Sequence, residues 1–233
     1  MKIALLGYGK MGKVIESIAI SRGHEIVFKK DTDNTFDGLQ NANVAIDFSV
    51  PSAAFTNISK CLQQNIPVIS GTTGWLSDYQ NAVDLCLKNN GSFIYSSNFS
   101  LGVNLFFQLN ENLAKTMSRF SQYQVSMEEI HHTQKLDSPS GTAISLANQI
   151  IENSNYTDWS DQGSLSKTIL INAKREANVP GTHSVSYRSD VDTIEIKHTA
   201  HNRDGFALGA VIAAEWLVNK KGVFTMKDVL ELQ

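Results

Sequence analysis

A glycine motif near the start of the chain constrains its fold more than any other feature. Gly7, Gly9 and Gly12 form the pattern G-x-G-x-x-G between an apolar run at 2–6 and an amphipathic helical pattern from about residue 13 to 22. In this setting the first glycine permits a tight turn, the second lets a pyrophosphate approach the backbone, and the third lets helix and strand pack closely. The motif therefore predicts a dinucleotide-binding βαβ unit.

The first hundred residues continue this alternation of strands and helices. Strand-like runs at 25–28, 44–48, 66–69 and 92–95 are separated by helical patterns of about a dozen residues. Such alternation predicts a Rossmann-type, doubly wound parallel sheet with right-handed crossovers. We expect this first domain to comprise residues 1–101 and 203–233.

The nicotinamide cofactor that such a domain would bind is not decided by the residues. Asp31 lies 24 residues after Gly7, where an acidic side chain can meet the ribose hydroxyls of NAD. Lys29 and Lys30 precede it, and a nearby cation favours the 2′-phosphate of NADP. Both cofactors therefore stay open.

Polar loops follow the later strands at the sheet edge where ligands of open α/β sheets bind. Ser49 or Ser52 could cap the next helix, with Pro51 in its first turn. Further along, the Gly71–Gly74 turn and the segment 96–99 offer backbone and hydroxyl groups to a ligand.

The pattern changes in the second half of the chain. Alternating residues at 123–127 predict a strand with one buried face, and further strands are expected at 168–173, 183–187 and 193–199. A helix is predicted at 143–151, a polar loop at 153–166 and a last helix at 205–219. Residues 102–202 are therefore expected to form a second α+β domain with a mixed sheet.

One segment of this second domain gathers acid–base and anion-binding groups. His131 and His132 are adjacent in a strand, so their side chains should point opposite ways and no shared metal site is predicted. Lys135 follows in a loop that can fold back towards one imidazole. Gly141 and Thr142 lie at a helix start, where free amides can hold an anion. This pattern favours a small acidic substrate that is protonated while bound.

Composition excludes several other classes of function. The net charge of −3 gives no reason to expect nucleic acid or an anionic membrane as a partner. The longest apolar run, 205–218, is short and carries Glu215, so it is not expected to span a bilayer. Cys61 and Cys86 match no metal or redox spacing. With no signal peptide expected before the first strand, we predict a cytoplasmic protein.

The motifs together resemble those of the dihydrodipicolinate reductase family. The similarity rests above all on the segment His131-His132-x-x-Lys135-x-Asp137-x-Pro139-Ser140-Gly141-Thr142-Ala143. The glycine motif, Asp47-Phe48-Ser49, Gly71-Thr72-Thr73-Gly74, the segment 98–104 and the segment 206–210 occur in family order. Ala177 replaces a glycine of the family's R-x-G-x-x-x-G-x-H pattern at 175–183, and the second domain is shortened.

The resemblance implies that NADH or NADPH reduces a cyclic, unsaturated dicarboxylate. His131 would be the general acid, with Lys135 as proton donor or orienting charge, and His132, Lys135, Gly141 and Thr142 would hold the carboxylates. The residues implied to line the cofactor site are Gly7, Gly9, Lys10, Met11, Gly12, Asp31, Gly71, Thr72, Thr73, Ser96, Ser97, Asn98 and Phe99. The resemblance also implies that the domain formed by residues 102–202 binds the substrate and mediates oligomerisation into a homotetramer.

Two other functions are compatible with a dinucleotide fold. Another nicotinamide-dependent oxidoreductase of similar architecture is one, although a thioester-forming enzyme would need a nucleophilic cysteine. A dinucleotide-binding sensor without catalysis is the other, and it would not need His131 with Lys135.

Overall fold

The computed structural model describes residues 1–31, 35–163, 166–202 and 204–232. It divides into two compact units, the first formed by Met1–Asn104 with Asp204–Gln233 and the second by Leu105–Arg203. The division falls within helix α4 (Leu101–Met117). The predicted boundary at residue 203 and residues 164–165 of the predicted loop lie outside the described residues. Cofactor binding by one domain and substrate binding by the other stay predictions.

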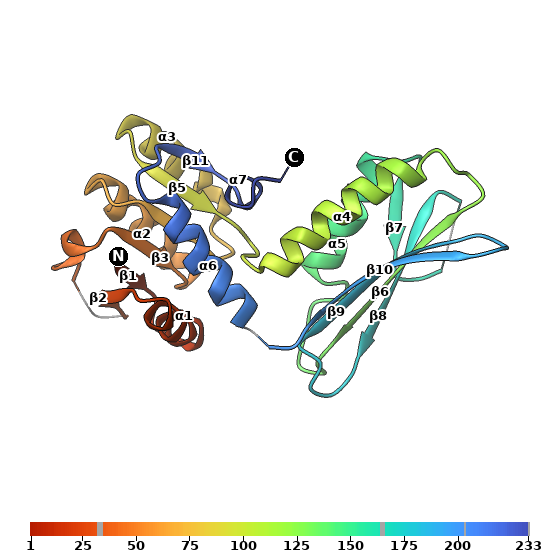
Figure 1. Ribbon diagram of the computed structural model, residues 1–233, viewed down its shortest axis with the longest axis horizontal. Coiled ribbons are helices and arrows are strands. Elements are labelled where there is room, and N and C mark those ends of the chain that lie inside the picture. Colours follow the sequence, from red (N-terminus) through yellow and green to blue (C-terminus); the bar gives the residue numbers. More distant parts are fainter. Residues whose placement is uncertain (32–34, 164–165, 203, 233) are drawn as a thin grey trace. The chain divides into compact units, whose positions relative to one another are not determined.

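The first unit contains a six-stranded parallel sheet in the order β11-β5-β4-β3-β1-β2 (Figure 1). Its strands are β1 (Lys2–Leu6), β2 (Glu25–Lys30), β3 (Val44–Asp47), β4 (Val68–Ser70), β5 (Ser92–Tyr95) and β11 (Gly222–Phe224). The strand order changes direction at β1, which lies between β3 and β2. The predicted Rossmann-type doubly wound sheet is confirmed.

Helices cover both faces of this sheet because both faces are apolar. In β1, Ile3 and Leu5 pack on one side, while Ala4 and Leu6 pack on the other. The first side is covered by α1 (Lys10–Ser21), α6 (Asp204–Leu217) and α7 (Met226–Val229), and the second by α2 (Pro51–Gln63) and α3 (Tyr79–Lys88). Two short 3₁₀ helices, Leu39–Asn41 and Leu76–Asp78, lie in the connections.

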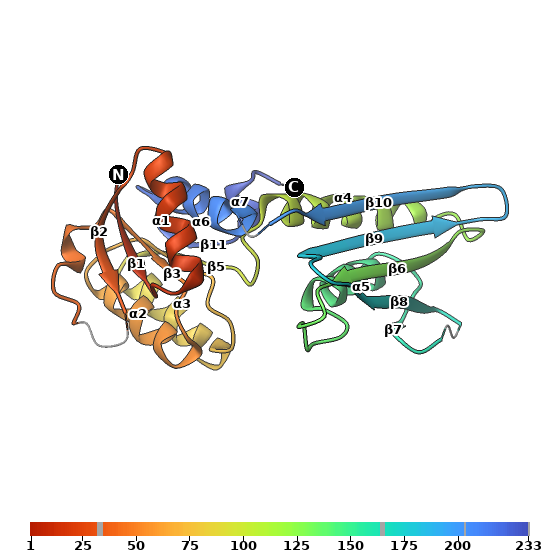
Figure 2. The same ribbon diagram turned by 90° about the horizontal axis from the view of Figure 1, so that it is seen from below.

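The second unit is a five-stranded mixed sheet in the order β10-β9-β6-β8-β7, as predicted for an α+β domain (Figure 2). The parallel pairs are β6–β8 and β7–β8, and the antiparallel pairs are β6–β9 and β9–β10. The strands are β6 (Gln124–His131), β7 (Asp158–Ser160), β8 (Thr168–Arg175), β9 (Gly181–Arg188) and β10 (Thr193–Ala200). Helices α4 and α5 (Gly141–Glu152) pack on one face, where buried Asn110 donates from Nδ2 to the carbonyl of Leu146.

Two local predictions were wrong, and one strand was not predicted. The loop predicted at 153–166 contains β7, and the segment after α6 contains β11, which no pattern indicated. Neither Ser49 nor Ser52 caps α2, whose N-cap is Val50. The Ser49 hydroxyl donates instead to the buried carboxylate of Asp47, at 2.7 Å. A charged, desolvated acceptor holds a hydroxyl more strongly than a helix end does.

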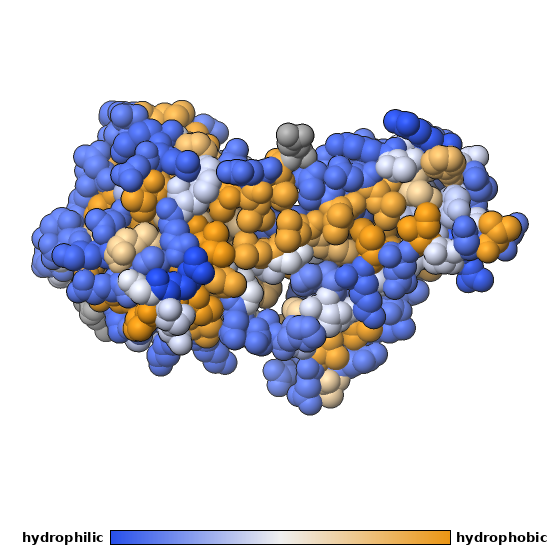
Figure 3. All heavy atoms as spheres, in the orientation of Figure 1, coloured by the Kyte–Doolittle hydropathy of each residue, from blue (hydrophilic) through white to orange (hydrophobic). Residues whose placement is uncertain are grey.

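Helix α4 carries an exposed apolar strip. Apolar side chains follow this helix in the space-filling view (Figure 3), and Leu105 and Leu109 are 48% and 57% exposed. Within the described residues, none of the helices combines the length and apolar character that crossing a membrane requires.

Candidate active site

The three glycines of the amino-terminal motif have different surroundings. Gly7 has φ +93°, and a Cβ there would lie 2.2 Å from the Phe48 carbonyl oxygen, so the turn requires glycine. A Cβ at Gly12 would lie 2.4 Å from the Gly7 carbonyl oxygen, so glycine lets this helix pack closely against the turn. A Cβ at Gly9 would meet no atom of the described residues within 4 Å, its chain neighbours aside. Gly9 is also the N-cap of α1, whose first amides receive no side-chain cap, and this arrangement suits an anion.

A cavity of about 430 Å³ adjoins this glycine turn. Of the predicted cofactor residues it brings together Gly7, Gly9 and Asp31. Its other lining residues, which the sequence did not indicate as a set, are Tyr8, Lys30, Phe36, Phe48, Ser49, Val50, Ala53, Thr56 and Asn57. Apolar walls with a few polar groups at one end are typical of a cofactor site.

The two lysines before Asp31 differ in their surroundings. The Lys29 ammonium forms a 2.6 Å ion pair with Glu16 and lies 4.6 Å from the ring centroid of Tyr8. Lys30 lies over the ring of Phe36 and lines the cavity together with Asp31. Lys30 is therefore the better placed cation for a 2′-phosphate, and Asp31 the group for a free ribose hydroxyl.

Asp47 organises the loops at the carboxyl edge of the sheet. Its carboxylate is fully buried and accepts hydrogen bonds of 2.7–2.9 Å from Ser49 Oγ, Asn57 Nδ2, Ser70 Oγ and Thr72 Oγ1. Burial raises the pKa of Asp47, and these four donors oppose that rise. The sequence indicated Asp47 as the end of a strand, but not as the acceptor that joins the Ser49 and Thr72 loops to α2 and β4.

The remaining predicted cofactor residues fall into two groups. Lys10, Thr73 and Ser97 are exposed, and Met11 is half-buried at the start of α1. Thr72 is buried with its hydroxyl bonded to Asp47, and Phe99 belongs to the core. A Cβ at Gly71 would lie 2.3 Å from the ring of Phe48. Ser96 Oγ donates to the Asn98 carbonyl. Phe99 and Thr72 thus have structural contacts that account for them without a ligand.

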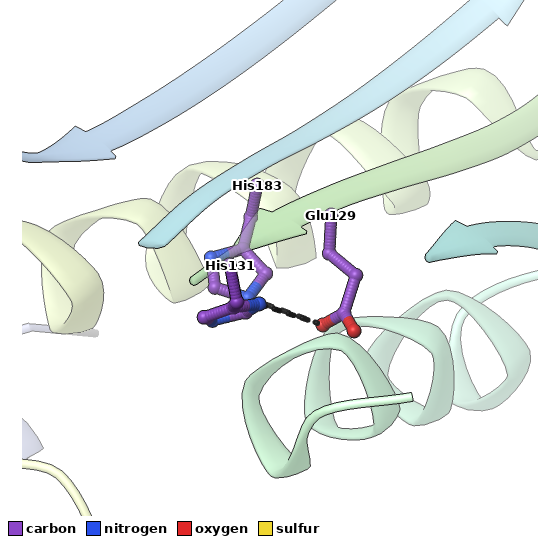
Figure 4. A group of neighbouring side chains, drawn as sticks. All are labelled: Glu129, His131 and His183. Atoms are coloured by element: carbon purple, nitrogen blue, oxygen red, sulfur yellow. Dashed lines mark ion pairs between the residues drawn. The ribbon is translucent and has the colours of Figure 1, made fainter. Parts of the chain in front are cut away.

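In the second unit, strand register assembles a buried cluster around His131 (Figure 4). Glu129 and His131 are two residues apart in β6, so their side chains share one face of the sheet. His183 lies directly opposite Glu129 in the antiparallel strand β9 and joins them on that face. The imidazole rings of His131 and His183 meet edge to face with centroids 5.0 Å apart.

The charges in this cluster are strongly coupled. Glu129 Oε2 lies 3.6 Å from His131 Nδ1 and 3.6 Å from His183 Nε2. Burial alone would raise the pKa of Glu129, but His183 and Ser140 outweigh it and lower the pKa to about 2. Burial, together with Lys135, Arg175 and His183, lowers the pKa of His131 to about 4, against the opposing effect of Glu129. His131 is therefore a neutral imidazole near pH 7 beside an ionised carboxylate.

Lys135 lies in the loop after β6, where Arg175 holds the backbone. The Lys135 ammonium pairs with the Asp137 carboxylate at 2.8 Å. The Arg175 guanidinium donates to the Asp137 carbonyl at 2.7 Å and to Glu129 Oε1 at 3.4 Å. His132 is half-buried, and its Nδ1 is a buried atom for which the described part of the chain offers no hydrogen-bond partner.

Ala177, where the family pattern has glycine, is exposed, and the left-handed residue of that turn is Asn178 with φ +63°. The turn therefore does not need a glycine at 177.

The start of helix α5 is open to solvent. Ser140 is its N-cap and accepts from the Ala143 amide, as predicted for a helix beginning here. Gly141 is exposed, and a Cβ built on it would meet nothing within 4 Å. Packing therefore does not require glycine at 141, which leaves close approach of a ligand to the backbone as a reason for it.

The cluster could also be considered for a metal. Among the residues that the structure describes, Glu129, His131 and His183 offer ligand atoms within 4.8 Å of one another. Arg175 pairs with the Glu129 carboxylate, and the Lys135 ammonium acts electrostatically on His131. These two positive charges would repel a divalent cation bound at the cluster. We assign no metal ligands here.

The thiols give no support to a cysteine nucleophile. Cys61 and Cys86 are both buried and reduced, and burial raises the pKa of each thiol. An unreactive, protonated thiol is the expected result. This finding disfavours a thioester-forming dehydrogenase.

Comparison with known proteins identifies relatives along the whole chain. The family model "Dihydrodipicolinate reductase, N-terminus" matches residues 1–99, and "Dihydrodipicolinate reductase, C-terminus" matches residues 102–230. The chain is 59% identical over 233 residues to the 4-hydroxy-tetrahydrodipicolinate reductase of Christiangramia forsetii, covering 99% of this chain and 98% of the relative. It is 33% identical to the enzyme of the same name from Thermosipho africanus, with the same coverage.

A solved structure has the same fold. Dipicolinate-bound dihydrodipicolinate reductase from Paenisporosarcina sp. TG-14 superimposes with a TM-score of 0.79, covering 97% of each chain at 22% identity.

Proposed function

The chain belongs to the dihydrodipicolinate reductase family, and on that premise we propose that it reduces 4-hydroxy-tetrahydrodipicolinate, or its dehydrated form, to tetrahydrodipicolinate. From the hydroxylated substrate the balance is one NAD(P)H and one proton consumed, with NAD(P)⁺ and water released. The reaction belongs to lysine and diaminopimelate biosynthesis. The observation that carries the proposal is the placement of His131, the Lys135 loop and the open start of α5 around one buried carboxylate.

The first unit is proposed to hold the cofactor. NADH or NADPH supplies the hydride when bound. The uncapped start of α1 would hold the pyrophosphate next to Gly9, and Asp31 and Lys30 would meet the adenosine ribose. The Asp47 network would fix the Ser49 and Thr72 loops at the same sheet edge.

The second unit is proposed to hold the dicarboxylate and to supply the proton. His132, Lys135, Gly141 and Thr142 would bind the two carboxylates with positive charge and backbone N–H groups. A proton bound to His131 would pass to the ring atom that becomes electron-rich as hydride adds. Lys135 would raise the local positive potential, or itself supply that proton.

A coupled assay tests the reaction. Dihydrodipicolinate synthase with pyruvate and aspartate semialdehyde generates the substrate in the cuvette, and NADH or NADPH absorbance is followed. We expect oxidation that requires all three components. Oxidation no faster than the background without the synthase would contradict the proposed function.

Variants separate the two predicted sites. We expect His131→Asn and Lys135→Ala to lower turnover by about 100-fold or more, since a positioned acid contributes about 10²–10⁴-fold. NADH affinity, measured by fluorescence titration, should stay within about twofold. Loss of NADH binding in either variant would show that the cofactor and substrate sites have been misplaced.

A homotetramer in the cytoplasm completes the proposal. The face of the second sheet opposite α4 and α5 carries exposed side chains such as Thr193, Glu195 and Lys197, which could pair with other copies of the chain. Sedimentation should give about four times the 25.7 kDa chain mass. A monomer at micromolar concentration would contradict it.

A further inference from the structure

Glu129 is a fully buried carboxylate to which the proposed reaction gives no role. Its side chain is 0% exposed, and burying a charge without partners is costly. A residue that served only to fill space in the sheet could be apolar, as Val125 and Met127 are on the same face of β6. The retained charge therefore needs a reason.

The surroundings hold Glu129 in one orientation. Its two oxygens accept from the Ser140 amide at 3.1 and 3.0 Å, and Oε1 also receives the Arg175 guanidinium at 3.4 Å. These donors come from the α5 cap and from β8, so the carboxylate is fixed from two further elements. His183 approaches from β9 and contacts Ser140 Oγ at 3.1 Å.

The ring of His131 is placed so that its two nitrogens face different surroundings. Nδ1 is buried, has no hydrogen-bond partner among the described residues and lies 3.6 Å from Glu129 Oε2. Nε2 lies on the side of the ring next to Gly181, where a Cβ would come within 3.2 Å of it. Gly181 thus leaves room beside Nε2 that another residue would occupy.

We propose that Glu129 is a positioning residue for His131: it holds Nδ1–H toward its carboxylate and leaves Nε2 as the nitrogen that carries the proton to the substrate. This inference rests on the proposed function, because it assigns Glu129 a part in the same proton transfer. At 3.6 Å the Nδ1–Oε2 contact is longer than a hydrogen bond. Contacts of this kind in ligand-free sites often shorten once substrate is bound.

The charges facing His131 define what Glu129 must do. Lys135 from the loop, Arg175 from β8 and His183 from β9 disfavour an imidazolium, and Glu129 alone among the groups that act on this ring favours it. In the transfer, the Nε2–H bond breaks, the proton forms a bond to the reduced ring of the substrate, and the imidazole is left neutral with Nδ1–H retained. The carboxylate stays ionised throughout, because the pKa of Glu129 is about 2.

Two isosteric variants in one strand test the assignment. Glu129→Gln removes the charge and keeps the shape, whereas Glu128→Gln makes the same change on the opposite face, where Glu128 pairs with Lys174. We expect the alkaline limb of the kcat profile to move to lower pH in Glu129→Gln. At pH values above the alkaline limb, each pH unit of this shift lowers kcat about tenfold. NADH affinity should not change, and Glu128→Gln should leave the alkaline limb at its wild-type pH. Glu129→Asp, which keeps a carboxylate, should move the limb back.

A second readout does not depend on activity. Nitrogen-15 NMR of labelled histidine in the wild-type protein should show His131 as the Nδ1–H tautomer, and the Glu129→Gln spectrum should lose that preference. An Nε2–H tautomer in the wild type, or a Glu129→Gln enzyme that is slower with an unmoved pH limb, would overturn the proposal. If the wild type oxidised no NAD(P)H, the proposed function would fail. The His131 tautomer would still show whether Glu129 holds Nδ1–H. If Glu129→Gln did not fold, the pH profile of Glu129→Asp and the wild-type tautomer of His131 would test the role of Glu129.

Discussion

At the scale of single residues, the proposed reaction requires His131 to carry a proton at a pH where the free protein leaves it neutral. Burial and the cations around it lower its pKa to about 4. A bound dicarboxylate brings two negative charges close to the imidazole and favours its protonated form. We therefore expect the substrate itself to favour the protonated acid, and a proton to be taken up when it binds.

This proton uptake can be measured directly. Pyridine-2,6-dicarboxylate, titrated by calorimetry at pH 6–7 in two buffers of different protonation enthalpy, should take up close to one proton per site. Uptake is expected only above about pH 4, because below that pH the free imidazole is already protonated. His131→Asn should abolish the uptake, and His24→Asn, in the first unit, should leave it unchanged. Equal heats in both buffers for the wild type would contradict the account of His131.

The sequence predicted His131 and Lys135 because they lie within five residues of one another. It did not predict the roles of Glu129, Arg175 and His183, although the 175–183 pattern was visible. Arg175 and His183 meet Glu129 across more than forty residues, through pairing of β6 with β8 and β9. Local spacing carries no information on that register. The same is true of Asp47, whose partner Thr72 is 25 residues away.

At the scale of elements, buried parallel strands and amphipathic helices were predictable because each carries a strong local pattern. The two strands that were missed, β7 and β11, have only three residues each and pair at sheet edges. Three residues are too few for a periodic signal, and an edge strand is defined by its partner. Helix α1 also begins at Lys10 rather than near Lys13, since its first turn lies within the glycine motif.

The start of α5 gives a prediction at this scale. Gly141→Ala should fold normally and gain at most about 0.5–1 kcal/mol of stability, because a Cβ at this helix start meets no atom. Its methyl group would obstruct the approach of a carboxylate to the helix amides, a charged hydrogen bond worth about 1.5–3 kcal/mol. We therefore expect pyridine-2,6-dicarboxylate to bind at least about tenfold more weakly.

Gly205→Ala is the matched control for this helix start. Gly205 lies in the first turn of α6, and a Cβ there makes an ordinary 3.5 Å contact with Ser100 Oγ. Its thermal stability should change as little as that of Gly141→Ala, with dicarboxylate affinity unchanged. Equal affinities for all three proteins would remove Gly141 from the proposed site.

At the scale of the whole molecule, the proposed reaction divides between two compact units. The first carries the uncapped α1 terminus and the cavity, and the second carries His131, Lys135 and the α5 terminus. In this proposal each unit supplies part of the groups that the reaction requires. Hydride transfer demands contact between donor and acceptor, so a ligand bound to each unit must restrict how the units move.

Solution scattering tests this requirement. We expect NADH and pyridine-2,6-dicarboxylate together to lower the radius of gyration, because two ligands in contact favour the arrangement of the units that accommodates both. Each ligand alone should have a smaller effect, since it contacts mainly one unit. Lys135→Ala is expected to weaken dicarboxylate binding and should therefore reduce the change at equal ligand concentration. Superimposable wild-type profiles with and without both ligands would mean that the units are already arranged for the reaction, and that binding requires no closure.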